Sequence, residues 1–246
     1  MSFDGQVAIV TGGAGGFGEA IAEELYNRGA FVYIFDYNLD GATKVAQRLN
    51  PGKVFPVQMD LSKVEEIEKA VNMVIGKSNR IDILVNNAGT SAGKPAVDVT
   101  EDDWDKIMNL NVKGTFFLTK FVGKQMIDNG GGKIVNVASV NALVAENNTV
   151  VYSTSKGAVA SITKLLAREW ARYGVRVNAI APCYGRTPLT EVLFQDEKIY
   201  NGIIKGIPAR RLVTPEEVAE AVTFLLSDKM KIVTGVVMPL DGARST

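Results

Sequence analysis

Tyr152 and Lys156 are the two side chains whose types and spacing best suit acid/base chemistry. They lie four residues apart at the start of a segment with the apolar periodicity of a helix, so both would share one helix face. A free tyrosine, with a pKa of about 10, is a poor base at neutral pH, but a nearby ammonium favours its phenolate. We therefore predict that Tyr152 exchanges a proton with a substrate and that Lys156 lowers the pKa of the phenol. The alternative is a pair that merely decorates a helix surface.

Ser139 is a candidate partner of this pair. It follows an expected strand, residues 133–137, and lies 13 residues before Tyr152. A hydroxyl at the carboxyl end of a central strand can donate to a carbonyl oxygen as negative charge develops on it, although a cap or turn serine would also fit here. The chain contains no histidine, the commonest general base, so acid/base chemistry must come from another side chain.

A regular alternation of strands and helices is expected to position these residues. Seven short β-branched runs predict strands, and most are continuously apolar, as in strands covered on both faces. They are residues 7–11, 31–35, 54–59, 83–85, 133–137, 176–180 and 236–240. Patterns typical of capping boxes at Ser62, Thr100 and Thr214 predict the starts of three helices. The alternation predicts an α/β fold of Rossmann type: one doubly wound, mostly parallel sheet in a single domain spanning residues 1–246.

The composition fits a globular domain without a strongly charged partner. The chain carries 27 basic and 27 acidic side chains, so no long-range field favours nucleic acid or an anionic membrane. No apolar stretch approaches the roughly 20 residues of a spanning helix, and the first residues do not resemble a signal peptide. Cys183 is the single cysteine, which excludes an intrachain disulfide and favours a reducing compartment. We therefore expect a cytoplasmic protein that binds neither nucleic acid nor membrane.

A glycine-rich turn between the first strand and a helix is typical of a dinucleotide-binding loop. Its sequence, TGGAGGFG over residues 11–18, would let backbone amides approach a pyrophosphate at the helix N-terminus. Asp36 follows 18 residues past the last glycine, where a carboxylate can accept hydrogen bonds from the adenosine ribose hydroxyls. It would also repel the 2′-phosphate of NADP, so we expect NAD as cofactor. Taken alone, the loop could be an ordinary tight turn, and Asp36 a helix cap or surface carboxylate.

Together these segments resemble the short-chain dehydrogenase/reductase family. The resemblance rests on the glycine loop, on the segment NNAG at residues 86–89 and on the Ser-Tyr-Lys spacing, and it extends to the segment LDG at residues 240–242. It implies two sets of site residues. The implied catalytic residues are Asn111, Ser139, Tyr152 and Lys156. The implied cofactor-binding residues are Gly12, Gly16, Phe17, Gly18, Asp36, Asp60, Leu61, Asn87, Ala88, Gly89, Tyr152, Lys156, Pro182 and Thr187.

The resemblance also implies a mechanism. Tyr152 would remove the proton of a substrate hydroxyl while hydride passes to the nicotinamide, and Ser139 would hold the substrate oxygen. Lys156 would bind the nicotinamide ribose and pass the proton onward through water. Asn111 would kink a helix and hold that water; it is favoured over Asn109 by the Val-x-Gly pattern that follows it. No metal is implied.

The resemblance weakens after the sixth strand. Cys183 stands where the family usually has glycine, and Gly185 where a branched apolar residue often contacts the carboxamide. Residues 188–207 correspond to a variable substrate lid. Its apolar residues are expected to line a pocket or to anchor a short helix: Leu189, Val192, Leu193 and Phe194. A polar loop after Ser139 suggests a hydroxylated substrate, although ordinary loop solvation explains it better: Asn141, Glu146, Asn147 and Asn148.

The expected activity is reversible hydride transfer between NAD(H) and a secondary alcohol or ketone of alcohol, sugar or polyol type. A 3-oxoacyl thioester reductase is the alternative within the family, and Asp36 argues against it because such enzymes usually take NADPH. A non-catalytic NAD(H)-binding sensor is an alternative of another class, and the intact catalytic set argues against that. Family members commonly form dimers or tetramers, so we expect a homo-oligomer.

Overall fold

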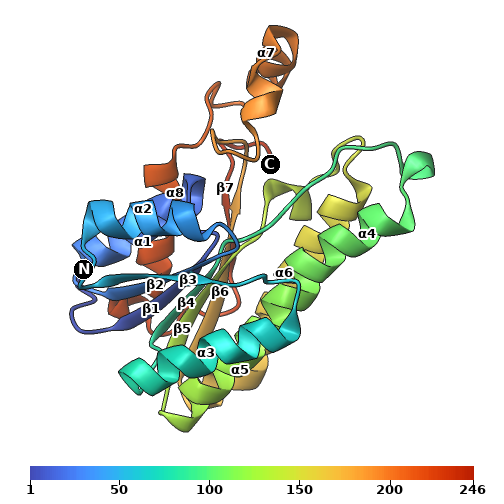
Figure 1. Cartoon of the computed structure of the whole chain (residues 1–246). Coiled ribbons are helices and arrows are strands. Elements are labelled where there is room, and N and C mark those ends of the chain that lie inside the picture. Colours follow the sequence, from blue (N-terminus) through green and yellow to red (C-terminus); the bar gives the residue numbers. More distant parts are fainter.

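A seven-stranded parallel sheet forms the centre of the computed structural model, which describes residues 1–246 (Figure 1). The strands pair in the order β3-β2-β1-β4-β5-β6-β7, every pair parallel. They are β1 (Val7–Thr11), β2 (Phe31–Asp36), β3 (Val54–Gln58), β4 (Ile83–Asn86), β5 (Gly132–Val137), β6 (Val175–Pro182) and β7 (Val237–Leu240). All seven strands expected from the sequence are therefore confirmed, with ends that differ by no more than two residues.

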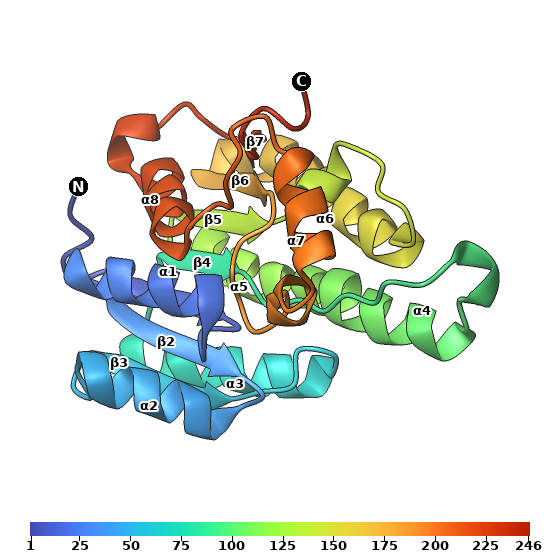
Figure 2. The same cartoon turned by 90° about the horizontal axis from the view of Figure 1, so that it is seen from above.

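Helices cover both faces of this sheet (Figure 2). One layer consists of α1 (Gly16–Asn27), α2 (Leu39–Leu49) and α8 (Pro215–Leu226). The other consists of α3 (Val64–Ser78), α5 (Thr115–Asp128) and α6 (Val150–Trp170). Two further helices extend beyond these layers (Figure 1): α4 (Glu101–Met108), which leads into α5, and α7 (Glu197–Lys205). No helix is long and apolar enough to cross a membrane.

Neighbouring residues of a central strand pack against opposite helical layers. In β1, Ala8 and Val10 join the core under α1, α2 and α8, whereas Val7 and Ile9 join the core under α3, α5 and α6. Because both faces are covered, both must be apolar. This explains why the strands read as continuous apolar runs rather than as an alternation of apolar and polar residues.

Two of the three expected capping boxes are confirmed. Thr100 and Thr214 each accept a hydrogen bond from the backbone amide three residues further on, and the acidic residue there returns the contact. The third, at Ser62, is wrong. Helix α3 begins after Lys63 without a side-chain cap, because the Ser62 hydroxyl donates instead to Oδ1 of Asp60 at 2.7 Å.

The strand order places a crevice between β1 and β4. The chain runs outward from β1 through β2 to β3, and then returns to start the other half of the sheet at β4. The connections after β1 and β4 therefore leave the sheet in opposite directions. Open parallel sheets bind ligands at the carboxyl ends of the strands at such a point.

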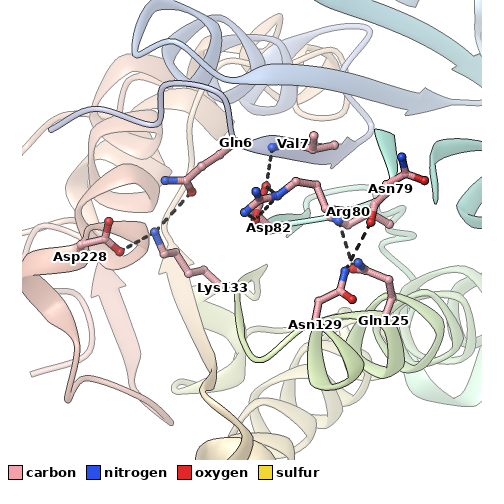
Figure 3. A network of polar contacts seen from close by, with 10 residues as sticks. Gln6, Val7, Asn79, Arg80, Asp82, Gln125, Asn129, Lys133 and Asp228 are labelled. Carbon is pink, nitrogen blue, oxygen red and sulfur yellow. Dashed lines mark hydrogen bonds and ion pairs between the residues drawn. The ribbon is translucent and has the colours of Figure 1, made fainter. Parts of the chain in front are cut away.

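Polar contacts fasten the opposite edge of the sheet, at the amino ends of the strands (Figure 3). The carboxylate of Asp82 accepts a hydrogen bond from the backbone amide of Val7 at 2.8 Å and is also paired with Arg80. Lys133 of β5 pairs with Asp228, after α8, at 2.6 Å. These contacts join β1 to the start of β4, and β5 to the segment after α8, at the end of the sheet remote from the crevice.

Candidate active site

A cavity of about 820 Å³ opens at the carboxyl ends of the strands, where the chain leaves β1, β2, β4, β5 and β6. Most residues expected at a site lie in its wall: Gly12, Gly16, Phe17, Asp36, Asn87, Ala88, Gly89, Ser139, Tyr152, Lys156, Pro182 and Thr187. Four others lie outside the wall: Gly18, Asp60, Leu61 and Asn111. The structure thus brings together, in one cavity, side chains that are up to 175 residues apart in the chain.

Tyr152 and Lys156 share one face of α6, as their spacing predicts. The ammonium nitrogen Nζ of Lys156 lies 5.8 Å from the centre of the Tyr152 ring. It donates a hydrogen bond of 2.8 Å to the carbonyl oxygen of Val137, the last residue of β5. Ser139 follows two residues after that strand and lines the same cavity. The hydroxyl, the phenol and the ammonium therefore converge at the end of β5.

Burial dominates the proton affinities of this pair. It lowers the pKa of Lys156 to about 8, because a charged ammonium is disfavoured away from water. It raises the pKa of Tyr152 for the same reason, and the nearby Ser139 hydroxyl offsets part of that rise. Without a bound cofactor, burial therefore outweighs the groups that favour the phenolate. The lowering of the Tyr152 pKa by Lys156 beside an oxidised nicotinamide stays a prediction.

Asn111 lies beneath the cavity wall in a distorted stretch of helix. Residues Asn109–Gly114 form a π-helical turn between α4 and α5, which confirms the helix distortion expected at this position. The side-chain amide of Asn111 donates to the carbonyl of Thr90 (2.9 Å) and to Ser155 Oγ (3.0 Å), and its oxygen accepts from the Thr90 amide. A Cβ atom at Gly89 would lie 3.4 Å from Lys156 Nζ and 3.3 Å from Asn111 Oδ1. Asn111 and Lys156 thus both lie close to Gly89.

The glycine loop wraps the start of α1 in a form that only glycines allow. Gly12 and Gly16 have φ angles of 65° and 58°, in the left-handed region that favours glycine. A Cβ at Gly18 would lie 2.0 Å from the carbonyl oxygen of Gly12, so Gly18 supports the loop from behind rather than lining the cavity. No side chain caps α1, which leaves its first backbone amides free to bind an anion.

The NNAG segment fastens this loop to the sheet. The side-chain amide of Asn87 donates to the carbonyls of Thr11 (3.0 Å) and Gly12 (3.1 Å). The hydroxyl of Thr11 accepts from the backbone amides of Asn87 and Ala88. Asn86 points the other way and donates to Thr119 and Asn136 inside the core. The segment therefore both stabilises the sheet and forms one wall of the cavity.

Asp36 lines the cavity at the end of β2, where the sequence places it. Its two carboxylate oxygens accept hydrogen bonds from the backbone amides of Ala14 (3.0 Å) and Asn38 (2.9 Å). A carboxylate oxygen can accept more than one hydrogen bond, so Asp36 keeps capacity for hydroxyl groups in the cavity. Asp60 and Leu61 do not share this position: the Asp60 carboxylate is engaged by Ser62 and Leu61 is buried in the core.

The two departures from the family pattern have different structural settings. Cys183 is buried against Val140 and Ile207, as expected for a small core residue, and burial raises the pKa of its thiol. Gly185 lies against Phe17: a Cβ there would be 2.6 Å from the ring atom Cζ. The phenylalanine of the glycine loop thus fills the volume that a side chain at position 185 would need.

The expected lid and the polar loop both contribute to the cavity. Of the lid's apolar residues, Leu189, Val192 and Leu193 line it, whereas Phe194 packs edge-on against Tyr200 at 5.9 Å and anchors a short helix. All four polar residues of the loop after Ser139 line it as well: Asn141, Glu146, Asn147 and Asn148. Sequence reasoning missed Tyr184, which also lines the cavity, and Arg244, which contacts Glu146 across 98 residues of chain.

The residues present fit a nicotinamide dinucleotide. The free amides at the start of α1 suit a pyrophosphate. The carboxylate of Asp36 suits ribose hydroxyls at one end of the cavity, and the group of Ser139, Tyr152 and Lys156 lies at another part of its wall.

Comparison with known proteins agrees with this geometry. A family model described as "Enoyl-(Acyl carrier protein) reductase" matches residues 12–243. The NAD-dependent glycerol dehydrogenase of Listeria innocua is 41% identical over 237 residues, which cover 96% of this chain and 92% of the relative. The 3-oxoacyl-[acyl-carrier-protein] reductase of Thermotoga maritima is 40% identical, with 98% of each chain covered. The chain belongs to the short-chain dehydrogenase/reductase family.

A solved structure confirms that the whole fold is that of a short-chain dehydrogenase/reductase. The NADH complex of 3-ketoacyl-(acyl-carrier-protein) reductase from Brucella melitensis superimposes with a TM-score of 0.93 at 36% identity, covering 100% of both chains. This short-chain dehydrogenase/reductase is accordingly an oxidoreductase that transfers hydride between a nicotinamide cofactor and an alcohol or carbonyl substrate.

Proposed function

We propose that this enzyme oxidises a secondary alcohol with NAD, or reduces the ketone with NADH, and that Tyr152 is its acid/base residue. The observation that carries the proposal is the convergence of Ser139, Tyr152 and Lys156 at the end of β5, in a cavity that also contains the glycine loop and Asp36. The glycerol dehydrogenase relative supports an alcohol or polyol as substrate.

In the proposed reaction the chain's own residues hold the substrate and move its proton. The bound nicotinamide supplies a hydride acceptor and a positive charge. Ser139 donates a hydrogen bond to the substrate oxygen, and Tyr152 takes the hydroxyl proton as the oxygen becomes a carbonyl. Lys156 holds the nicotinamide ribose, and its ammonium, together with the added positive charge, favours the phenolate against the opposing effect of burial. Asn111, which like Lys156 lies close to Gly89, holds the water that carries the proton away.

The cofactor-binding roles follow the same geometry. The amides of Gly16 and Phe17 at the start of α1 hold the pyrophosphate, and Asp36 accepts the adenosine ribose hydroxyls. Gly18 supports the loop by its close approach to Gly12. The sequence resemblance assigns adenine contact to Asp60 and Leu61. Because neither residue lines the cavity, the adenine would have to contact them from outside the cavity wall. Asn87, Ala88, Gly89, Pro182 and Thr187 complete the binding surface.

We propose NAD rather than NADP because of the charges around Asp36. The residues that follow it in the cavity wall, Tyr37 and Asn38, are uncharged, and the wall contains no arginine. A 2′-phosphate would therefore face a carboxylate without a compensating cation. Replacing Asp36 by alanine is expected to lower the NAD/NADP ratio of kcat/KM, and an unchanged ratio would contradict the ribose contact.

The acid/base role is tested by Tyr152→Phe. The variant removes the hydroxyl and keeps the ring, so NADH formation at 340 nm with a panel of alcohols should fall by about 10²-fold or more, while NAD still binds. Tyr173→Phe is the matched control, because Tyr173 is a half-exposed tyrosine outside the cavity. Turnover that survives Tyr152→Phe would overturn the assignment, and NAD binding without turnover of any substrate would favour the sensor alternative.

A 3-oxoacyl thioester reductase is the second candidate, favoured by the Thermotoga maritima relative and the Brucella melitensis structure. The same assay distinguishes the two, because a reductase of this class would reduce an acetoacetyl thioester with NADPH or NADH faster than the enzyme oxidises any alcohol. We expect the alcohol to be preferred.

We also propose a cytoplasmic homo-oligomer, a dimer or tetramer, with residues 188–207 as the substrate lid. The single cysteine supports a reducing compartment. Partly exposed apolar side chains on α4, α5 and α6 support association: Trp104, Phe116 and Leu165. Light scattering of the purified protein would reveal its mass, and a 26.5 kDa particle would contradict the oligomer.

A further inference from the structure

One carboxylate stands among uncharged polar groups in the cavity wall beyond Ser139. Glu146 lies in the loop between the short helix η3 (Val140–Ala142) and α6. The uncharged polar residues that line the cavity with it are Asn141, Asn147, Asn148, Thr149 and, from the loop after β4, Ser91. Nothing in the proposed hydride transfer uses Glu146.

Arg244 holds this carboxylate in place from behind. Its guanidinium nitrogen Nη2 pairs with Oε2 of Glu146, and its guanidinium carbon lies 5.4 Å from the ring centre of Tyr184. The turn that carries Arg244 is itself fixed, because Asp241 accepts hydrogen bonds from the amides of Ala243 (3.0 Å) and Ser245 (2.8 Å). The Glu146 side chain is 28% exposed and that of Arg244 only 16%. Glu146 thus faces the cavity, whereas Arg244 is not part of its wall.

The charges of the wall disfavour an anionic substrate. Lys156 is its only cation, and its ammonium is already bonded to the carbonyl of Val137 beside the reacting phenol. Asp36 and Glu146 are the two carboxylates. A carboxylate or phosphate on the substrate would find no free cation in the wall, and it would lie nearer to Glu146 than to Arg244, which compensates Glu146 from outside the wall.

The same wall suits hydroxyl groups. The contact with Arg244 uses Oε2 of Glu146. The other carboxylate oxygen, Oε1, makes no hydrogen bond within the protein. Burial and the charge of Glu146 raise the pKa of Tyr184 to about 12, so its phenol stays protonated and can donate. A hydroxyl both donates and accepts, and it can therefore bind a carboxylate oxygen and an amide or phenol donor at once.

We infer that Glu146 is a specificity-determining residue that accepts a hydrogen bond from a hydroxyl of a neutral, polyhydroxylated substrate, and that Arg244 is the positioning residue that holds it. This inference rests on the proposed function. It narrows the substrate to a neutral polyol and excludes sugar acids and sugar phosphates of the same size as that polyol.

The wild-type enzyme tests the inference without any substitution. Initial rates with NAD are measured for two neutral polyols, glycerol and threitol, and for the carboxylates of matched length, glycerate and threonate. We expect kcat/KM for the neutral member of each pair to be higher by about 10²-fold. Equal or higher values for the carboxylates would overturn the inference.

Two variants should change the ratio of kcat/KM for the neutral polyol to kcat/KM for the carboxylate in opposite directions. Glu146→Gln keeps the size of the side chain but leaves the charge of Arg244 uncompensated, so the preference for neutral substrates should shrink by about 10-fold or more. Arg244→Gln leaves the charge of Glu146 uncompensated, so the preference should grow while KM for the polyol rises and kcat changes little. A merely structural pair would lower both substrates' rates alike in both variants.

Glu24→Gln is the matched control. Glu24 has the same side-chain exposure, 28%, and also pairs with an arginine, Arg28, but it lies on α1 outside the cavity wall. The Glu24→Gln variant should show the same ratio of kcat/KM for polyol and carboxylate as the wild type. If the wild type oxidises alcohols but neither Glu146→Gln nor Arg244→Gln changes the ratio, only this inference fails. If the wild type oxidises no secondary alcohol, the proposed function fails and the inference with it.

Discussion

Gly185→Ala is expected to force a methyl group into space that the Phe17 ring and the Val213 backbone already occupy. The added Cβ would lie 2.6 Å from Cζ of Phe17 and 2.8 Å from the backbone oxygen of Val213. Both distances are well below van der Waals contact, so the ring and the adjacent backbone must shift. Overpacking of this kind costs about 1–3 kcal/mol of unfolding free energy.

Phe17→Leu should relieve one of these two contacts. By itself the substitution nearly conserves volume and costs about 1 kcal/mol. In the double variant the ring no longer opposes the new methyl group, but the contact with the Val213 oxygen remains. We therefore expect the double variant to lose about 1 kcal/mol less unfolding free energy than the two single losses added together, within the usual coupling range for residues in contact.

Urea unfolding of the four proteins measures this coupling, and KM for NAD gives a second reading. Both residues line the cavity, so Gly185→Ala should raise KM for NAD and the added Phe17→Leu should restore part of the loss. Gly76→Ala is the control, because a Cβ there meets no atom within 4 Å; within α3 it should stabilise the protein by about 0.5–1 kcal/mol.

Additivity would refute the reasoning. If the loss in the double variant equals the sum of the single losses to within about 0.5 kcal/mol, Phe17 and residue 185 do not compete for space. The glycine at 185 would then be required by the Val213 backbone alone.

Three further predictions concern stability. Burial lowers the pKa of Lys156 from 10.5 to about 8, so between these pH values the unfolded chain binds more protons than the folded one and the unfolding free energy should rise with pH. Lys156→Met should remove this rise of about 3 kcal/mol, and equal pH profiles of unfolding for the variant and the wild type would contradict this. Asp82→Ala leaves the buried amide of Val7 without its acceptor (Figure 3) and should cost about 1–3 kcal/mol, whereas Asp82→Asn, which keeps a carbonyl oxygen, should cost less in the same urea titration. Thr214→Ala removes the cap of α8 and should lower the unfolding free energy by about 1 kcal/mol; no change would mean that the capping box contributes nothing.

The strands, the cofactor loop and the acid/base pair could be predicted from short stretches of sequence. Short β-branched runs indicated the seven strands, and the central strands are continuously apolar because they are covered on both faces. Tyr152 and Lys156 share a face because helical geometry relates residues four apart. Asn111 was expected to distort its helix, and the π-helical turn confirms it. In each case the residues that decide the structure are close together in the chain.

Other features could not be predicted from the local sequence pattern. Ser62 was expected to cap a helix, but it bonds Asp60, and only the folded loop shows which partner it takes. The Phe17 ring and Gly185 share one volume, although nothing near either residue in the sequence indicates it. The proton affinities of Tyr152 and Lys156 depend on how completely the fold removes them from water, a quantity that spacing does not contain.

The sequence by itself therefore determined the fold, the family and the chemical groups of the site, because these depend on local periodicity and on short motifs. Only the tertiary structure decided which groups from distant parts of the chain meet, as with Glu146 and Arg244 across 98 residues. Packing and desolvation are properties of the three-dimensional neighbourhood, and they set both the shape of the cavity and the charge that a substrate meets in it.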